Sequence, residues 1–263
     1  MKIKKPEDIA DYKSWLKKEH NVEISAKAES HYDIVANRIK VQFESSLFWI
    51  NLSKKLKEFD DEYLINRKYP LLISDNIPKL ELKPFDSFLL KTFRKNILEN
   101  KNWPKEPEEG WILPNDWFSK INDIVRTLFI VKYLDGVEFL IDKIRSLCTA
   151  QNLIYNTQLE AKEEGYYAAH TYIGQEFTIP SMTLDPDKRT IYVELQITTQ
   201  LQDVIRKLLH CYYEKRRKTT KKENIKWQWA WQSDEFAANY LGHILHYVEG
   251  MIMDIRKKQK GEL

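Results

Sequence analysis

Cysteine is scarce in this chain, which has only Cys148 and Cys211 among 263 residues. Two thiols cannot supply a four-cysteine zinc site and show no disulfide framework, so a reducing, cytoplasmic setting is expected. The N-terminus turns acidic at once and lacks the apolar stretch of a secretion signal. No apolar run approaches the ~18 residues that a membrane span needs. We also find no internal repeat and no low-complexity segment.

The composition is that of a globular protein with little net charge. Hydrophobic residues make up 43% and aromatic residues 13% of the chain, and the formal net charge is +3. Such a chain can bury a substantial core, which argues against disorder. The mildly basic balance points by itself to no class of partner. The length fits one or two domains, and one is plausible.

Hydrophobic periodicity predicts an α/β (α+β) fold. Apolar or alternating segments predict strands, and Asp135–Gly136 predicts a turn after one of them. We expect a mixed, largely antiparallel sheet of about five strands flanked by helices. The predicted strands are 127–134, 163–173, 177–184 and 190–199, with a turn at 185–188, and the predicted helices are 6–19, 26–60, 84–95, 137–151, 200–217 and 234–258.

The segment 190–199 carries a carboxylate in the middle of a strand that otherwise looks internal. Read with a two-residue period, one face is apolar and the other holds Glu194 and Gln196. Burying a carboxylate is costly unless a charged or hydrogen-bonding group meets it, so Glu194 faces either solvent or a site. The apolar face consists of Ile191, Val193, Leu195 and Ile197.

The segment 163–173 also alternates, with Tyr166, Ala168 and His170 on one face. If this segment and 190–199 are neighbouring strands, Tyr166, His170 and Glu194 would line one surface. The small side chain of Ala168 would leave room there for a flat ligand. This pair of segments is therefore the first candidate for a binding site.

Two further features allow a structural or a functional interpretation. Lys83, Ser87 and Lys91 recur every four residues, and periodicity alone favours a solvated helix face. Asp123 stands at the entrance of a predicted strand, where an aspartate is commonly a turn former. Together with Glu194, however, it would give two carboxylates from separate elements, as a magnesium site for nucleotide chemistry usually contributes.

The C-terminal part combines a basic run with a long helix. A charge run is usually a solvated tail, although a phosphate backbone would also attract it. Trp227–Trp231 is expected to anchor the last helix to the core, and we assign no chemistry to His243 and His246 of that helix. The basic run is Lys215, Arg216, Arg217, Lys218, Lys221 and Lys222, and the apolar stripe of the helix is Phe236, Tyr240, Ile244, Val248, Met251 and Ile255.

Four segments resemble motifs of the RelA/SpoT-type alarmone synthetases. Gly165-Tyr-Tyr-Ala-Ala-His170 resembles their Gly-Tyr-x-Ser-x-His motif, and Val193-Glu-Leu-Gln-Ile197 their Glu-Ile-Gln-Ile-Arg-Thr strand. Lys83, Ser87 and Lys91 match the last three positions of their Arg-x-Lys-x-x-x-Ser-x-x-x-Lys segment. Asn122-Asp-Ile-Val-Arg126 is similar to their Asp-Ile/Leu-x-Gly-x-Arg segment. This last variant and the following Tyr133-Leu-Asp-Gly136 are most like the toxic small alarmone synthetases.

The resemblance spans about residues 83–210 and implies a single synthetase domain with a nucleotidyltransferase-like fold over 1–263. Its parts would be a helical segment 1–80, a catalytic core 81–217 and a helical extension 218–263. The implied activity is a Mg²⁺-dependent transfer of pyrophosphate from ATP to a ribose 3′-hydroxyl. The implied roles are catalysis by Asp123, Glu194 and Gln196, Mg²⁺ binding by Asp123 and Glu194, ATP binding by Lys83, Ser87, Lys91 and Arg94, and acceptor binding by Tyr166, His170, Lys162 and His210.

Three departures from the family pattern bear on ATP binding and on the acceptor. Glu81 replaces the first Arg of the ATP segment, and Arg94 or Lys95 would have to compensate. Glu164 and Thr198 stand where the family has an Asn and an Arg that contact a guanine nucleotide. The acceptor is therefore either GDP or GTP, giving a (p)ppGpp-type alarmone, or the 3′ end of tRNA. A tRNA-modifying toxin would also imply a protein antitoxin, and no membrane partner is expected.

Two other functions stay open from the sequence. A non-catalytic nucleic-acid- or partner-binding module would need Asp123 or Glu194 to be buried by a structural partner or turned outward. An ordinary nucleotidyltransferase would release pyrophosphate from ATP, whereas pyrophosphate transfer would release AMP.

Overall fold

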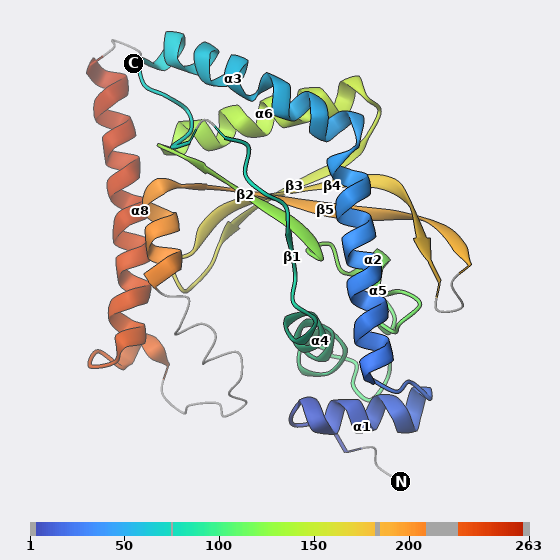
Figure 1. Cartoon of the computed structure of the whole chain (residues 1–263). Helices are drawn as coiled ribbons and strands as arrows, with labels where there is room; N and C mark the ends of the chain where they lie inside the picture. Colours follow the sequence, from blue (N-terminus) through green and yellow to red (C-terminus); the bar gives the residue numbers. More distant parts are fainter. Residues whose placement is uncertain (1–3, 75, 182–184, 209–225, 260–263) are drawn as a thin grey trace. The chain divides into compact units, whose positions relative to one another are not determined.

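The computed structural model describes residues 4–74, 76–181, 185–208 and 226–259, and it confirms the α+β class (Figure 1). Five strands form one sheet in the order β1-β2-β5-β4-β3. None of the helices in the described residues is both long and apolar enough to span a membrane. The strands are β1 (Glu81–Leu82), β2 (Val125–Val131), β3 (Ile154–Ala161), β4 (Tyr167–Pro180) and β5 (Pro186–Thr199). The helices are α1 (Ile9–His20), α2 (Ala26–Glu44), α3 (Leu47–Arg67), α4 (Phe85–Phe93), the π-helix η1 (Arg94–Leu98), α5 (Trp117–Lys120), α6 (Leu134–Ala150), a helical stretch over 200–208, η2 (Trp227–Trp229) and α8 (Asp234–Gln259).

The chain divides into two compact units. Unit 1 comprises residues 1–46, 80–126 and 174–194, and unit 2 comprises 47–79, 127–173 and 195–263. Strands β2, β4 and β5 each contribute residues to both units. The subdivision at residues 80 and 217, which the resemblance implied, stays a prediction.

Unit 1 fixes helix α4 and its π-helical continuation through an aromatic cluster. Tyr12 and Trp15 of α1 pack with Phe93 and Ile97. Asn96 of η1 accepts a hydrogen bond from the Ile112 amide at 2.9 Å and donates one to the Ile112 carbonyl at 3.0 Å. The long loop before α5 is thereby fastened to the helix. Trp103, Trp111 and Trp117 pack against the body of unit 1.

The single long helix expected over 26–60 is two helices. Helix α2 ends at Glu44 and α3 begins at Leu47. The Ser45 hydroxyl donates to the carbonyls of Val41 and Gln42, and such local side-chain bonds compete with continued helical bonding. The predicted helix therefore breaks at the Ser45–Ser46 pair.

The turn expected at Asp135–Gly136 is the first turn of α6, and β2 begins at Val125 and ends at Val131, earlier than predicted at both ends. The Asp135 carboxylate accepts hydrogen bonds from the hydroxyls of Tyr63 at 2.6 Å and Tyr69 at 2.8 Å. A Cβ at position 136 would meet the Leu71 side chain at 3.0 Å, so the glycine permits close packing here instead of a turn. Helix α6 packs along α3 within unit 2 (Figure 1).

The predicted strands 163–173 and 177–184 both fall on one continuous strand, β4, which covers 167–180 and is a neighbour of β5 as expected. The turn expected at 185–188 lies largely in β5, which begins at Pro186. Strand β3 was not predicted, because it lies at the edge of the sheet and is mostly exposed. The apolar face of β5 is confirmed, with each of Ile191, Val193, Leu195 and Ile197 at most 1% exposed.

Helix α8 has about the predicted length, and the Ser233 hydroxyl caps its N-terminus by accepting a hydrogen bond from the Phe236 amide at 3.1 Å. The side of α8 that faces the protein is not the apolar side that the sequence pattern predicts. The apolar stripe is exposed from Tyr240 onward, Phe236 is half-buried, and Trp229 and Trp231 are exposed as well. The buried side carries Ala238, Asn239, Gly242 and Glu249. Gly242 explains why this side faces inward: a Cβ there would lie 2.4 Å from the Gly165 carbonyl oxygen, so only glycine allows the contact with the β3–β4 turn.

Candidate active site

Two lysines and one aspartate form a buried ionic cluster in unit 1. Lys83 Nζ lies 2.9 Å from Asp123 Oδ2, and Lys91 Nζ lies 2.8 Å from Asp123 Oδ1. Lys83 is 7% and Asp123 8% exposed, whereas the Lys91 side chain is about one third exposed. The structure therefore brings together three residues that the resemblance assigned to ATP and metal binding.

The backbone fixes this cluster from two sides. Strand β1 pairs antiparallel with β2, with Glu81 opposite Arg126, and the Lys83 amide donates to the Ile124 carbonyl at 2.8 Å. The Tyr32 hydroxyl donates to the Lys83 carbonyl at 2.7 Å. Lys83 and Asp123 are thus held at the ends of adjacent strands. Lys91 comes from α4, two helical turns further on.

Burial and charge act in opposite directions on the Asp123 carboxyl. Burial alone would raise its pKa, but the ammonium groups of Lys91 and Lys83 outweigh burial and hold the pKa well below the usual range. Burial lowers the pKa of Lys83, the Asp123 carboxylate offsets part of that effect, and Lys91 and Arg126 add to the lowering. The local surplus of positive charge is what a polyphosphate would neutralise.

Glu194 is the second candidate carboxylate. It lies in the same unit as Asp123, is 3% exposed, and belongs to β5, the neighbour of β2 in the sheet. Magnesium takes oxygen ligands and is usually held by one or two carboxylates together with substrate phosphates. Asp123 and Glu194 fit that donor set. Within the described residues no group of three or more His, Cys, Asp or Glu side chains could hold a metal ion alone.

Arg126 belongs to the cationic surroundings and was not singled out from the sequence. It is half-buried in β2, directly opposite Glu81, and its charge lowers the pKa of Lys83. The two cations expected to compensate for Glu81 are engaged elsewhere. Arg94 pairs with Glu99, and Lys95 lies 3.7 Å from Glu109. Arg126 stands in the segment matched to a family motif, but a role that arises from pairing across two strands leaves no linear pattern, so the sequence did not reveal this role.

The remaining ATP-binding candidate, Ser87, lies exposed on α4, one helical turn before Lys91. Its side chain therefore lies at the surface of unit 1, outside the buried part of the cluster.

The acceptor-site candidates lie in unit 2, at the start of β4. The Tyr166 hydroxyl and His170 Nε2 are 3.1 Å apart, and Lys162 Nζ lies 5.5 Å from the centre of the Tyr166 ring. Lys162 also lies 3.9 Å from Glu160. Strand alternation places Ala168 and His170 on the face opposite Tyr167, and Tyr167 contacts α8 by stacking on His246 at 3.7 Å. The predicted grouping of Tyr166 and His170 is therefore present.

Gln196 and Thr198 lie on the same face of β5. Positions 169, 171 and 173 of β4 and 191, 193, 195 and 197 of β5 are buried, so Gln196, like Ala168 and His170, lies on the opposite, less buried face of its strand. Thr198 is 2% exposed and its hydroxyl donates to the Tyr167 carbonyl at 3.0 Å. At this position a structural hydroxyl replaces the arginine of the family motif. His210 and the basic run from Lys215 to Lys222 lie outside the described residues.

Comparison with known proteins identifies the fold. No protein-family profile and no curated protein matches the chain. The small alarmone synthetase 1 from Bacillus subtilis bound to its product pppGpp superposes with a TM-score of 0.54, at 15% identity, over 85% of this chain and 97% of that chain. The same protein bound to AMPCPP gives a TM-score of 0.50 at 16% identity, over 86% and 96%. This chain therefore has the fold of the small alarmone synthetases.

Proposed function

We propose that this protein is an ATP-dependent pyrophosphokinase that modifies a ribose 3′-hydroxyl in the cytoplasm. The observation that carries the proposal is the buried Lys83–Asp123–Lys91 cluster in a unit that also contains Glu194, on the fold of the small alarmone synthetases. A purely structural ion pair needs one cation for one carboxylate. Here two lysines contact Asp123, and Arg126 lies close enough to lower the pKa of Lys83, a surplus of cations that suits polyphosphate binding.

On the ATP side, Lys83 and Lys91 exchange the Asp123 carboxylate for phosphate oxygens when the nucleotide binds. Arg126 supplies the third cation, replacing the arginine whose position Glu81 occupies. Arg94, already paired with Glu99, contributes less, and the Ser87 hydroxyl donates to a phosphate from the surface of α4. These contacts neutralise charge on the transferred group, which is the main requirement of phosphoryl transfer.

In the reaction the acceptor 3′-oxygen attacks the β-phosphorus of ATP, the bond from that phosphorus to the α–β bridging oxygen breaks, and AMP leaves. Glu194 accepts the proton of the hydroxyl, and Gln196 positions the ribose. Magnesium, held by Asp123 and Glu194 with the phosphates, would supply further charge neutralisation when bound. Release of Asp123 from its lysines makes that carboxylate available as a ligand.

On the acceptor side, the Tyr166 ring stacks on the acceptor base, and His170 and Lys162 contact its ribose and phosphates. Lys162 lies near the Tyr166 ring, so charge and stacking act on the same group. Base stacking on an aromatic side chain is typically worth about 1–3 kcal/mol. We place His210 on the same acceptor from the resemblance alone.

The acceptor is GDP or GTP, or the 3′ end of tRNA. Thr198 is buried and bonded to the backbone of β4, so it provides no phosphate contact where the family has an arginine. Fewer contacts to a free nucleotide favour tRNA, as does the basic run at Lys215–Lys222. A toxin of this kind would need a protein antitoxin.

Product analysis tests the proposal directly. The protein is incubated with Mg²⁺ and ATP labelled at the γ-phosphate, together with GDP, GTP or bulk tRNA in separate reactions. Label on one acceptor with AMP in equal amount supports pyrophosphate transfer and identifies the acceptor. Release of pyrophosphate points to a nucleotidyltransferase. Absence of turnover with every acceptor favours the non-catalytic module.

A further inference from the structure

Two tryptophan rings lie open to solvent just before helix α8. Trp229 is 79% and Trp231 70% exposed, whereas the other tryptophans of the described residues are buried or half-buried. Tryptophan is highly buried on average, and its large amphipathic ring is enriched where proteins bind other molecules. The chemistry proposed above uses neither ring. These two side chains are therefore a binding feature without an assigned ligand.

The backbone that carries the two rings is fixed by turns. The Ala230 amide donates to the Trp227 carbonyl at 3.0 Å, and the Ser233 amide donates to the Ala230 carbonyl at 2.8 Å. The Trp227 ring packs edge-on against Tyr240 of α8, with the ring centres 5.4 Å apart. Because this backbone is already ordered, a ligand that contacts the exposed rings meets a small entropic cost of ordering the protein.

The same segment is joined to the β3–β4 turn, which carries candidates for the acceptor site. Gln228, in the middle of η2, donates a hydrogen bond to the Glu163 carboxylate. His243 of α8 holds the same turn, with its Nε2 2.9 Å from the Glu163 carbonyl oxygen. The turn is closed by the Lys162 amide, which donates to the Tyr166 carbonyl at 2.9 Å. The exposed tryptophans therefore lie beside the proposed acceptor site, within unit 2.

The number of aromatic rings bears on the kind of acceptor. A free GDP or GTP has one base, and the Tyr166 ring takes that base in the proposed function. Trp229 and Trp231 would then remain without a ligand. A polynucleotide carries further bases before its terminal one, and unpaired bases stack readily on aromatic side chains. Three rings in one region therefore suit the single-stranded end of a nucleic acid.

Charges near the two rings favour contact with bases over contact with phosphates. Lys226 and Lys162 are basic, whereas Glu163 and Asp234 are acidic. A surface of mixed sign attracts a phosphate chain weakly, so binding at this place depends on the ring faces. The attraction of the nucleic-acid backbone falls to the basic run Lys215–Lys222, which precedes this segment in the sequence.

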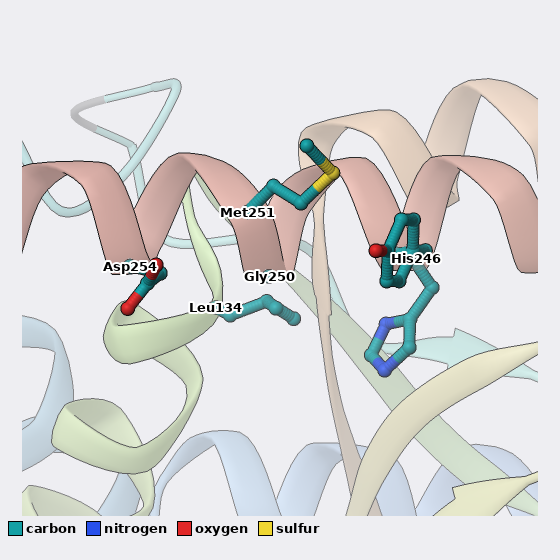
Figure 2. A pocket seen from close by; sticks show the side chains of 6 residues that line it. Leu134, His246, Gly250, Met251 and Asp254 are labelled. Carbon is teal, nitrogen blue, oxygen red and sulfur yellow. The ribbon is translucent and has the colours of Figure 1, made fainter.

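The hollow beside α8 is a separate feature. It has a volume of about 400 Å³, and of the described residues that line it none is a tryptophan or belongs to the 162–166 turn. Figure 2 shows it between α8 and the start of α6. Trp229 and Trp231 therefore offer open ring faces instead of an enclosed pocket, and an open face accepts any base. The lining residues are Leu134, His246, Tyr247, Gly250, Met251 and Asp254.

We propose that Trp229 and Trp231 form a stacking surface for the bases that precede the acceptor nucleotide at the single-stranded 3′ end of an RNA. The inference rests on the proposed function for the identity of the acceptor hydroxyl, and it selects an RNA end over GDP or GTP. Tyr166 holds the terminal base and the two tryptophans hold bases before it. Together the three rings fix which nucleotide of the strand reaches the acceptor site.

Fluorescence anisotropy tests the stacking surface without any need for catalysis. The probe is a 5′-labelled single-stranded RNA of about twelve nucleotides that ends in the tRNA sequence CCA. Trp229→Ala and Trp231→Ala should each weaken binding roughly tenfold or more, as for the loss of one stacked base. Trp229→Phe, which keeps a ring, should bind almost as tightly as wild type. Trp229→Leu, which is apolar but not aromatic, should behave like Trp229→Ala.

Tyr247→Ala is the matched control for this measurement. Tyr247 is an aromatic residue of α8 that is 71% exposed and lines the separate hollow, so its removal should leave RNA binding unchanged. A wild-type protein that does not bind the RNA, as expected if the tryptophans contact another protein, overturns the inference. Wild-type affinity in Trp229→Ala and Trp231→Ala, or in Trp229→Leu, overturns it as well.

Steady-state transfer to bulk tRNA separates this inference from the proposed function. Trp229→Ala and Trp231→Ala should raise the KM for tRNA roughly tenfold or more and leave the KM for ATP unchanged. Transfer to GDP or GTP without RNA binding would support the proposed function and overturn the inference. RNA binding that depends on the two rings, without transfer to any acceptor, would support the stacking surface and contradict the proposed function.

Discussion

Lys83 Nζ lies 2.9 Å from Asp123 Oδ2, and both residues are almost fully buried. A buried ion pair is weak support for stability, because desolvation offsets most of its attraction. The ion pair instead holds a cation and a carboxylate in place at the ends of the paired strands β1 and β2. The proposed function uses both groups after they separate.

Replacing Lys83 should impair ATP use more than protein stability. Lys83→Met keeps an unbranched side chain but removes the ammonium group, and Lys91 still neutralises Asp123. We expect kcat/KM for ATP to fall roughly 100-fold, as for loss of one preorganised charge contact. Steady-state kinetics with matched thermal unfolding measure this. Lys95→Met, which removes a partner of Glu109, should keep near wild-type activity; equal loss in both variants would contradict a specific role for Lys83.

The depressed pKa of Asp123 should make the stability of the protein vary with pH in the acid range. Because its pKa is depressed in the folded protein, its contribution is present above the ordinary value of 3.8 and is lost as the pH falls below that value. Asp123→Asn should lower the free energy of unfolding by about 3 kcal/mol at pH 7, since Lys83 is left buried with an uncharged partner. The difference in the free energy of unfolding between wild type and Asp123→Asn should be smaller at pH 3. Urea unfolding at pH 7 and pH 3 measures this difference, and an equal difference at both pH values would contradict a depressed pKa for Asp123.

Arg126 should matter more for ATP than Arg94. Arg126→Ala removes a cation beside Lys83, whereas Arg94→Ala removes one already paired with Glu99. A hydrogen bond to a charged group contributes about 1.5–3 kcal/mol, so we expect kcat/KM to fall roughly tenfold or more for Arg126→Ala and less for Arg94→Ala. The ATP dependence of the initial rate gives both values. A larger loss of kcat/KM in Arg94→Ala than in Arg126→Ala would indicate that Arg94, at the start of η1, is the cation that compensates for Glu81.

Tyr166 should act on the acceptor and not on ATP. Tyr166→Ala removes the stacking ring and should abolish measurable transfer while the far-ultraviolet circular dichroism and the unfolding temperature stay close to wild type. Tyr166→Phe keeps the ring but loses the hydroxyl near His170 and should retain most activity. Wild-type activity in Tyr166→Ala would rule out the stacking role.

Deprotonation of the buried Glu249 carboxyl should destabilise the protein at alkaline pH. Burial raises its pKa to about 7, and this effect outweighs the lowering by a hydrogen bond with the Thr199 side chain. Because the folded-state pKa is raised, stability is highest below 4.5 and is lost as the pH rises through 7. Glu249→Gln should therefore be more stable than wild type at pH 8, by on the order of 2–3 kcal/mol, and equal to it near pH 4.

Chemical unfolding of Glu249→Gln across this pH range measures the difference. Glu58→Gln, at an exposed glutamate of α3, serves as the control and should follow the wild-type curve. A gap between Glu249→Gln and wild type that does not grow from pH 4 to pH 8 would contradict a buried, protonated carboxyl.

The sequence predicted the fold class, and it singled out Lys83, Lys91 and Asp123, which the structure brings together, because both predictions depend on local patterns. Alternation in 190–199 identified the buried face of β5, and the four-residue spacing from Lys83 to Lys91 identified two members of the ionic cluster. Periodicity alone would have placed those lysines in solvent. The resemblance, and not the spacing, assigned these lysines to ATP binding and Asp123 to metal binding; the direct contact between them was not predicted.

Features that depend on distant contacts were not predictable. The contribution of Arg126 arises from strand pairing with β1, and β3 is an exposed edge strand with little apolar signal. The orientation of α8 was predicted wrongly, because its stripe has the pattern of a buried face. The position of α8 is set instead by two glycines, Gly165 and Gly242, that permit backbone contact.

The most direct measurement of the central claim follows both ends of the ATP molecule in one reaction. With γ-labelled ATP, Mg²⁺ and the productive acceptor, the wild-type protein should form AMP and labelled acceptor in equal amounts, and Asp123→Asn and Lys83→Met should form neither at a comparable rate. Labelled free pyrophosphate in place of labelled acceptor, or unchanged turnover in both variants, would contradict the account.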